Sequence, residues 1–268
     1  MPRLSDPLMI VTDLDGSLLD HHTYSWEPAQ AWLDRLIGAE IPVVICSSKT
    51  AAEIAPLQRA LGITGMPFIS ENGAIVDGGS MGSVPPVAQQ GLEYAALCDR
   101  LDQLRSRYNA KFIGFADVTQ KEVADWTGLS PHDALLAKQR QGSESIIWRD
   151  TPEKFTLFQL WLADEGLELV QGGRFWHVMS QGSGKGAALA WLLEHLSPPS
   201  SSRYLTVGLG DGPNDAPMLE NTDYAVIIKG YSKTPVRLLR RDSENIFHST
   251  HFGPQGWSEG LTHFITRD

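Results

Sequence analysis

Two carboxylates separated by one residue, Asp13 and Asp15, stand near the amino end of the chain and are followed by Gly16. They come directly after residues 8–11, an apolar run that is typical of a buried β-strand. Because open α/β sheets bind ligands at the carboxyl ends of their strands, we expect both side chains at a binding edge. The same residues are also compatible with a simple turn, since Asp and Gly favour turns for local backbone reasons.

A second acidic cluster lies far along the chain and favours a shared site over two separate turns. Residues 204–209 have the composition of another buried strand, and they run directly into Gly210, Asp211 and Gly212, with Asp215 shortly after. The sequence therefore predicts two strands that each end in carboxylates and glycines.

This combination suits a magnesium-assisted phosphoryl transfer. Mg²⁺ takes oxygen ligands, usually one or two carboxylates together with water and substrate phosphate. We expect it between Asp13, Asp211 and the backbone carbonyl of Asp15. The metal would offset the repulsion between an anionic nucleophile and an anionic phosphate.

Four segments, in order along the chain, resemble the motifs of the haloacid dehalogenase superfamily of phosphohydrolases. The resemblance implies that Asp13 attacks phosphorus, Asp15 exchanges the proton, Ser47 hydrogen-bonds the phosphoryl oxygens and Lys185 neutralises charge. It also implies a magnesium site made by Asp13, Asp15, Asp211 and Asp215. The fold implied is α/β, a Rossmann-like parallel-sheet core with an inserted α+β cap domain. Ser17 stands where Thr is commoner in the family, which keeps the hydroxyl.

The resemblance narrows to mannosyl-3-phosphoglycerate phosphatases through residues 46–50, 71–74, 173–177 and 208–219. It implies a small-molecule sugar phosphate substrate, with mannosyl-3-phosphoglycerate converted to mannosylglycerate and phosphate. Relatives that act on other sugar phosphates share several of these segments, so another sugar or polyol phosphate, such as glucosyl-3-phosphoglycerate, stays open. A non-catalytic sensor of a phosphorylated ligand is a third alternative.

Further side chains are expected to contact substrate. Those in the core are Ser48, Lys49, Glu71, Asn72 and Asn214. Lys49 is also compatible with a solvated position at a helix entrance, and Glu71 and Asn72 with a simple turn after a strand.

In the insertion, we expect substrate contacts from Arg174 and His177, because Arg can hold a carboxylate through two parallel hydrogen bonds. The alternative interpretation makes His177 a satisfied histidine and Arg149 an ion-pair partner of Asp150. It places the neighbouring aromatic residues in the core of the insertion, and these are Trp148, Phe175 and Trp176.

These side chains need a scaffold, and alternating strand and helix signals predict a parallel sheet. A helix is expected around Pro28, with Trp32, Leu33, Leu36 and Ile37 on one apolar face and Gly38 at its end. Another is expected from the capping-box spacing of residues 50–53, with Gly62 beyond its last turn. Towards the carboxyl end, residues 224–228 predict a strand, and the final residues predict a helix.

The alternation changes after a glycine- and proline-rich segment at residues 78–86, which predicts a hinge. We therefore assign residues 84–180 to an inserted α+β cap and residues 1–83 and 181–268 to a discontinuous catalytic core. The elements expected in the insertion are a helix at 87–108, a strand at 111–115, a polar helical stretch, a strand at 145–148, a helix from Pro152, and strands at 167–170 and 175–179.

Composition favours a cytoplasmic enzyme. The chain has 268 residues, 42% of them hydrophobic, without an apolar run long enough to span a membrane or an N-terminal signal segment. The two cysteines are too few for a disulfide framework. The net charge of −10 disfavours general nucleic-acid binding, which depends on basic side chains.

Three rival motifs fail on their spacing. Residues 182–186 contain Gly-Lys but lack the P-loop hydroxyl and have a misplaced first glycine. Gly208 begins a dinucleotide-like pattern, yet Pro213 occupies the place of its final glycine. Cys46 ends an apolar run without a following Arg, so a core position is expected and a cysteine phosphatase is not.

Overall fold

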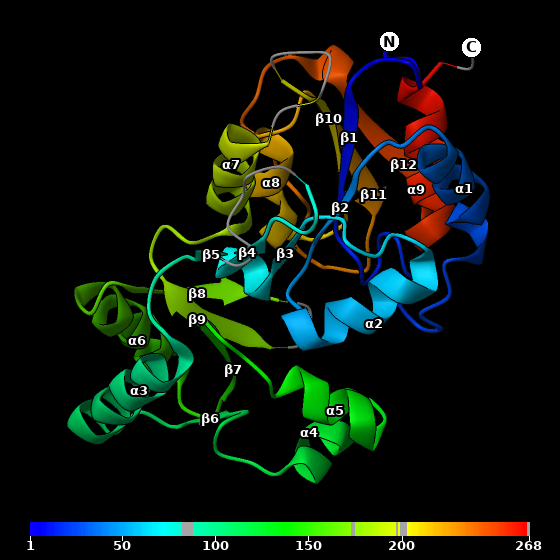
Figure 1. The fold of residues 1–268 in the computed structure, drawn as a ribbon. Helices are drawn as coiled ribbons and strands as arrows, with labels where there is room; N and C mark the ends of the chain where they lie inside the picture. Colours follow the sequence, from blue (N-terminus) through cyan, green and yellow to red (C-terminus); the bar gives the residue numbers. More distant parts are fainter. Residues whose placement is uncertain (82–87, 173–174, 197, 199–202, 267–268) are drawn as a thin grey trace.

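The computed structural model describes residues 1–81, 88–172, 175–196, 198 and 203–266. Two sheets organise the described chain: an eight-stranded sheet with the order β12-β11-β10-β1-β2-β3-β4-β5 and a four-stranded sheet with the order β6-β7-β9-β8 (Figure 1). The fold is mixed α/β with a mostly parallel central sheet, as the sequence predicts.

Neighbouring strands of the central sheet are parallel from β12 to β3. β4 pairs antiparallel with β3, and β5 pairs antiparallel with β4. Its strands are β1 Leu8–Thr12, β2 Val43–Cys46, β3 Phe68–Ser70, β4 Ile75–Asp77, β5 Ala88–Gln89, β10 Leu205–Gly210, β11 Tyr224–Lys229 and β12 Ile246–Phe252. β1 lies between β10 and β2, so the strands expected to carry the site are neighbours.

Helices cover both faces of this sheet (Figure 1). One face packs against α1 Gln30–Gly38, α2 Ala51–Leu61 and α9 Gly253–Phe264, and the other packs against α7 Lys185–His195 and α8 Ala216–Glu220. In β1, Leu8 and Ile10 face the first layer while Met9 and Val11 face the second. This strand is therefore apolar throughout because it is buried on both sides. Short 3₁₀ turns complete the layers, namely η1 Glu27–Ala29, η2 Glu71–Gly73, η3 Pro213–Asp215 and η4 Ser243–Asn245.

The helix boundaries largely agree with their local signals. Thr50 and Glu53 form the capping box of α2, and Gly62 ends that helix. In α1, Trp32, Leu33 and Leu36 are buried as expected. Ile37 is not, because it is 36% exposed at the edge of the apolar stripe. The helix ends at Gly38, as predicted.

The insertion forms the four-stranded antiparallel sheet and the helices beside it. Its elements are α3 Tyr94–Tyr108, β6 Phe112–Gly114, α4 Gln120–Thr127, α5 Pro131–Ala137, β7 Ser143–Trp148, α6 Pro152–Asp164, β8 Leu167–Gln171 and β9 Trp176–Ser180. This small sheet and its helices have their own apolar core.

The start of the insertion differs from the expected position. β5 still pairs with β4 of the central sheet, so the change of sheet comes after Gln89 instead of at residue 84. The first cap helix begins at Tyr94 and not at residue 87. Gly91 has φ +111° and lies against Ser180, a backbone conformation that excludes an earlier helix start.

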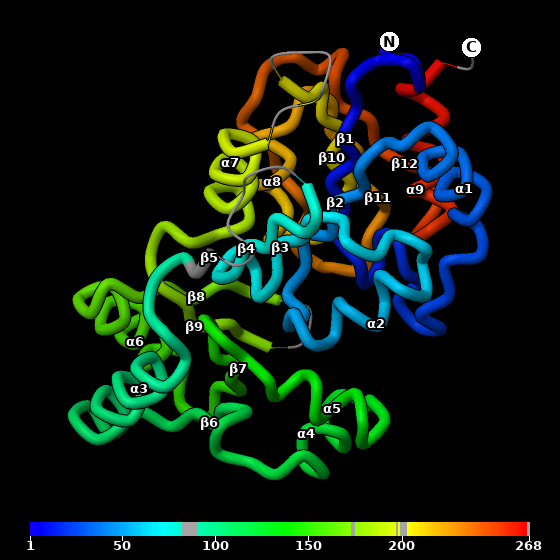
Figure 2. Tube along the Cα trace, in the orientation of Figure 1, coloured from blue at the N-terminus to red at the C-terminus, as the bar shows by residue number. Residues whose placement is uncertain are grey.

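Two further features complete the fold. β12, which the sequence analysis missed, adds to β11 at the sheet edge, where its histidine, serine and threonine side chains produce no apolar run. The chain ends meet, because Arg3 bridges Thr266, and both termini lie at the same end of the molecule (Figure 2). Among the described helices, none has the length and apolar character that crossing a membrane would require.

Candidate active site

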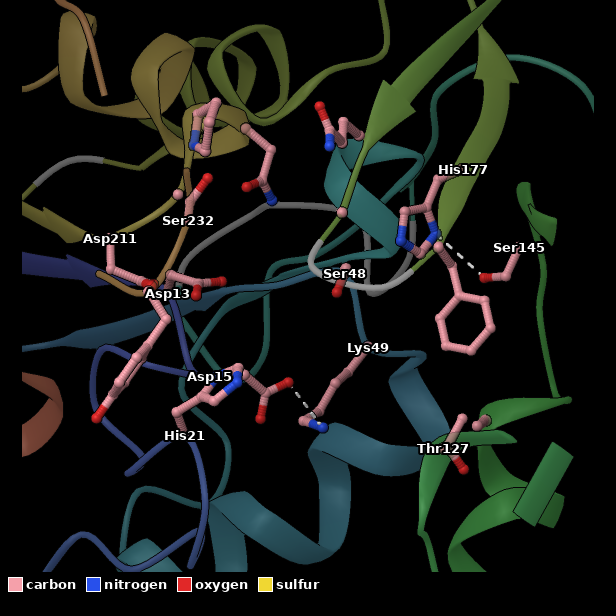
Figure 3. Close-up of a pocket in the computed structure, with 18 of the residues that line it drawn as sticks. Asp13, Asp15, His21, Ser48, Lys49, Thr127, Ser145, His177, Asp211 and Ser232 are labelled. Carbon is pink, nitrogen blue, oxygen red and sulfur yellow. Dashed lines mark hydrogen bonds and ion pairs between the residues drawn. The ribbon is translucent and has the colours of Figure 1, made fainter. Parts of the chain in front are cut away.

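A cavity of about 570 Å³ lies where the carboxyl ends of the central strands face the cap. Asp13 and Asp15 follow β1, Ser48 and Lys49 follow β2, and Asp211 follows β10, and all of them line the cavity (Figure 3). The cap contributes the opposite wall, which includes His177 and Ser145. The strand order thus brings together side chains that are almost 200 residues apart in the sequence.

Lys185, the first residue of α7, is the buried cation of the site. Its Nζ lies 2.8 Å from Asp13 Oδ1 and 2.6 Å from Asp215 Oδ1, and the side chain is 1% exposed. The other oxygen of Asp215 accepts hydrogen bonds from the N–H groups of Asp211 and Gly212. Asp215 therefore fixes both the lysine and the loop that carries Asp211.

Asp13, Asp211 and Asp215 offer carboxylate oxygens that all lie within 4.8 Å of one another. Burial and then repulsion from Asp215 raise the pKa of Asp13 to about 7, in spite of Lys185. Burial and then repulsion from Asp13 raise the pKa of Asp211 to about 8. One lysine does not balance two buried carboxylates and the half-buried Asp211, so this oxygen-only donor set suits a hard divalent cation such as Mg²⁺.

The turn after β1 is shaped around Asp211. Ser17 Oγ donates a hydrogen bond to Asp211 Oδ1 at 3.1 Å. Gly16 has φ +87°, and a Cβ added there would lie 2.6 Å from Asp211 Oδ2. Only glycine suits this close approach, so the Asp-x-Asp-Gly sequence serves the site as well as the turn.

Asp15 lies apart from the three-carboxylate cluster. Its Oδ2 pairs with Lys49 Nζ at 3.0 Å, while its Oδ1 is buried without a hydrogen-bond partner among the described residues. Lys49 also approaches Glu53 at 3.9 Å and lies over the Tyr24 ring. The Lys49 side chain is only 16% exposed, so a solvated position at a helix entrance is excluded.

Ser47 and Asn214 hold loops at the edge of the cavity. Ser47 is buried at the end of β2, and its hydroxyl accepts a hydrogen bond from the Lys49 backbone N–H at 3.2 Å. Asn214 lines the cavity and donates to Asn72 Oδ1 at 3.2 Å. Asn72 itself lies beneath it, with φ +56°.

Glu71 is buried at the junction of the core and the cap, and it is not among the residues that line the cavity. Its carboxylate accepts hydrogen bonds from the backbone N–H groups of Gln141, Gly142 and Ser143 and from the Ser143 hydroxyl. The structure therefore places Glu71 where it holds the cap against the core, instead of in direct reach of a ligand.

In the cap wall, the His177 ring is buried and its Nδ1 lies 3.1 Å from Ser145 Oγ. Burial, followed by the positive charges of Arg140 and Lys185, lowers the pKa of His177 to about 3. The imidazole is therefore neutral at physiological pH, and it faces the cavity (Figure 3).

The other predictions for the cap residues have different outcomes. Trp148 and Trp176 pack on the cap core, whereas Phe175 packs on a second cluster and also lines the cavity. Asp150 pairs with Lys154 at 3.2 Å, so it does not require Arg149 as its ion-pair partner. Arg174 lies outside the described residues.

Sequence reasoning missed several cavity residues. Tyr231, Ser232 and Lys233 follow β11, so the rule that identified the ends of β1 and β10 would also have found them. His21 comes from the loop after β1. Arg140 had no such signal, because it precedes a cap strand and reaches the cavity only through the folding of the insertion.

Two family models match the chain. One, described as haloacid dehalogenase-like hydrolase, matches residues 10–124, and the other, described as Sucrose-6F-phosphate phosphohydrolase, matches residues 167–265. Together they include the segments that carry Asp13, Asp15, Ser47, Lys185 and Asp211.

Solved structures share the fold over nearly the whole chain. A phosphatase of the haloalkanoate (HAD) enzyme superfamily from Bacteroides thetaiotaomicron has a TM-score of 0.68 at 17% identity, covering 97% of this chain and 96% of its own. The sucrose-phosphatase from Synechocystis sp. PCC6803, solved with sucrose and phosphate, has a TM-score of 0.61 at 17% identity, covering 97% and 98%. A protein from Thermoplasma acidophilum has a TM-score of 0.68 at 19% identity, covering 97% and 98%.

Proposed function

We propose that this haloacid dehalogenase-like hydrolase removes the phosphate from a sugar phosphate, with mannosyl-3-phosphoglycerate as substrate and mannosylglycerate as the second product. One observation carries the reaction type: the buried Lys185 holds Asp13 at 2.8 Å, and Asp13 lines the same cavity as Asp15 and Asp211. A sensor would need phosphate contacts, but it would not need a nucleophile and a separate proton donor in the same place.

In the first step, an Asp13 oxygen attacks phosphorus, the bond from phosphorus to the leaving oxygen breaks, and Asp15 supplies the proton that the leaving oxygen takes. In the second step, Asp15 removes a proton from water, and the water oxygen attacks phosphorus and releases Asp13. Lys185 stabilises the negative charge that gathers on the phosphoryl group. Lys49, 3.0 Å from Asp15, holds that carboxylate beside the cavity in both steps.

Asp13 and Asp211 would hold Mg²⁺, with Asp215 beside them and the Asp15 backbone carbonyl as a further oxygen donor. When bound, the ion would neutralise charge on the phosphate and on the carboxylates around it. The clustering of three carboxylates, of which a single lysine pairs with two, supports this assignment.

The cavity size supports a substrate larger than a simple phosphate ester. About 570 Å³ lies within the usual range for small-molecule sites, roughly 300–1,000 Å³. The match to the Sucrose-6F-phosphate phosphohydrolase family supports a sugar phosphate. The mannosyl compound rests on the four segments described above, and a different sugar or polyol phosphate is the second candidate. We also infer a reducing, cytoplasmic setting from the two cysteines, Cys46 and Cys98, which are both free.

The decisive experiment measures Mg²⁺-dependent phosphate release from mannosyl-3-phosphoglycerate, glucosyl-3-phosphoglycerate, hexose phosphates and 3-phosphoglycerate. We expect the highest kcat/KM for the mannosyl compound and a loss of about 10³-fold or more in Asp13→Asn. Asp6→Asn, at an exposed ion pair with Arg3, is the matched control and should retain activity. Preference for another ester would contradict the mannosyl compound as substrate and keep the phosphatase. No release from any ester would favour the non-catalytic sensor.

A further inference from the structure

Arg140 is a buried cation in the cap wall of the cavity. It lines the cavity just before β7, and its side chain is 3% exposed. Burying a guanidinium is costly unless charged or polar groups face it, so its surroundings indicate what it binds. Lysine and arginine side chains are otherwise among the least frequently buried.

One edge of the guanidinium is held by the protein. Nε donates to the Ser143 backbone carbonyl at 2.8 Å, and Nη2 donates to Ser143 Oγ at 2.6 Å. Glu71 Oε2 lies 3.7 Å from Nε, but that carboxylate already accepts four hydrogen bonds from the segment 141–143. These contacts fix the edge of the guanidinium that faces Ser143.

The second terminal nitrogen, Nη1, has no hydrogen-bond partner among the residues that the structure describes. Arg140 lines the cavity, and Nη1 is not among the side-chain atoms that are buried without a partner, so this donor is open to water or to a ligand in the cavity. Because Nε and Nη2 are already held, Arg140 can bind a ligand through Nη1 without losing further side-chain entropy.

Glu71 and the buried cap residue Glu144 act electrostatically on Arg140 from behind the wall, but no acidic residue of the described cap lines the cavity itself. The acidic residues that line the cavity, Asp13, Asp15, Glu53 and Asp211, all come from the core. The described cap residues that line it supply a neutral imidazole, His177, a hydroxyl, Ser145, and uncharged or apolar side chains. Arg140 is therefore the one charged side chain in this part of the described lining.

We propose that Arg140 is a specificity-determining residue that binds a carboxylate on the leaving group of the substrate. This inference rests on the proposed phosphatase function, and it defines the substrate class as phosphate esters with a carboxylate remote from the phosphate. The phosphate is attacked at the core wall, while the carboxylate pairs with the guanidinium across the cavity. A guanidinium suits this role because its charge is permanent and its planar donors match carboxylate oxygens.

The test compares kcat/KM for 3-phosphoglycerate and glycerol 3-phosphate, two esters that differ only in having a carboxylate or a hydroxymethyl group. We expect the wild-type enzyme to prefer the carboxylate ester. In Arg140→Met, the ratio of the two kcat/KM values should fall by about 10- to 100-fold, the usual range for a lost charge-assisted hydrogen bond. Arg149→Met, the same change at an exposed arginine of the cap, should leave the ratio as it is.

Two results would overturn the proposal: a wild-type enzyme without preference for the carboxylate, or an Arg140→Met enzyme that loses both activities by the same factor. The second result would mean that Arg140 acts only through Ser143 and Glu71. If Arg140→Met does not fold, the same ratio is measured in Arg140→Lys, which keeps the charge but loses the planar donors. Its ratio should fall severalfold, and an unchanged ratio counts against the proposal.

Binding of free glycerate, measured by calorimetry, separates this inference from the proposed function. The wild-type protein should bind glycerate about 10-fold more tightly than Arg140→Lys, while Arg149→Met should match the wild type. Should no ester be hydrolysed, the phosphatase function fails, yet this difference would still support the carboxylate site. Active enzyme with equal glycerate affinity in all three proteins would remove the carboxylate site and leave the phosphatase.

Discussion

The two walls of the cavity are built on different principles. The core wall is dense in charge: Lys185 contacts Asp13 and Asp215, Asp215 binds the loop of Asp211, and Ser17 binds Asp211. Among the described residues, the cap wall carries a single charged side chain, Arg140, together with a neutral His177 and uncharged or apolar residues. The difference supports our proposal that the core wall performs the chemistry and that the cap wall selects the leaving group.

The two walls also differ in how they are held. Core side chains follow neighbouring strands that are buried on both faces, which limits their movement. The cap contacts the core through bonds that include the Glu71 carboxylate with residues 141–143 and the Thr50 hydroxyl with the Leu136 carbonyl. The position of the cap wall therefore depends on contacts between segments far apart in the sequence.

The largest effect is expected at Lys185, which joins the core wall together. Lys185→Met leaves Asp13 and Asp215 buried without their cation, so kcat/KM for phosphate release should fall by about 10³-fold. The free energy of unfolding should fall by about 3 kcal/mol in urea denaturation. Lys154→Met, at a surface ion pair of the cap, should change activity less than about 2-fold. Activity within tenfold of the wild type in Lys185→Met would refute the central role of the lysine.

The next effect concerns the carboxylate cluster, which the cap wall lacks. Mg²⁺ at about 100 times its Kd should raise the free energy of unfolding by about 3 kcal/mol, measured as a shift in Tm. Asp211→Asn should abolish this gain, whereas Asp34→Asn on the exposed face of α1 should keep it. A Mg²⁺ shift that survives in Asp211→Asn would place the ion elsewhere.

The Asp211 carboxylate should also make the stability of the metal-free protein, measured in EDTA, depend on pH. The pKa of Asp211 is raised to about 8, from an ordinary value of 3.8, so the unfolded chain releases this proton at lower pH than the folded one. Stability of the metal-free protein should therefore fall as pH rises from 4 to 8. In Asp211→Asn, this decline should be weaker, and the Tm at pH 8 should be higher than that of the wild type. A steeper decline in the variant would contradict the raised pKa of Asp211.

A smaller effect is expected where the two walls join. Glu71→Gln replaces the charged acceptor of three backbone N–H groups and leaves Arg140 without its nearby carboxylate, so unfolding should become easier by about 2 kcal/mol. Glu93→Gln, an exposed position before α3, is the matched control. A change in Glu71→Gln below about 0.5 kcal/mol would show that the junction does not depend on this charge.

The smallest effect is expected in the cap wall itself. The pKa of His177 is lowered to about 3, so the unfolded chain takes up this proton near pH 6.5 while the folded protein resists it. Stability from His177 is complete above pH 6.5 and is lost as pH falls towards 3. Between pH 6.5 and 5, the wild type should lose about 1–2 kcal/mol more than His177→Gln in urea denaturation. His132→Gln, an exposed cap histidine, should follow the wild type, and identical slopes in all three proteins would show that His177 is protonated in the folded state.

Much of the core wall could be predicted from the sequence because its signals are local. An apolar run followed by Asp13 or Asp211 predicts a buried strand with a carboxylate at its end, and Thr50 with Glu53 predicts a helix start. Each signal depends on a few consecutive residues whose backbone geometry follows from their own side chains. Parallel pairing of these strands then brings their ends to one edge.

The cap wall could not be predicted in the same way. Arg140 carries no local signal, and its role depends on Glu71 and Ser143, which meet it only after the insertion has folded onto the core. Glu71 looked like a substrate contact because it follows β3, yet backbone N–H groups about 70 residues away surround its carboxylate. The polar strand β12 was missed for a related reason, since pairing with β11 defines it and its composition does not.

The sequence by itself therefore determined which carboxylates follow which strands, which lysine begins the next helix, and that an insertion interrupts the core. Only the tertiary structure decided that Lys185 pairs with Asp13 and Asp215, that Lys49 holds Asp15, and that Arg140 lines the cap wall of the cavity. The physical reason is range. Backbone preference and apolar periodicity act over a few residues, whereas the pairing of buried charges depends on which distant segments exclude water together.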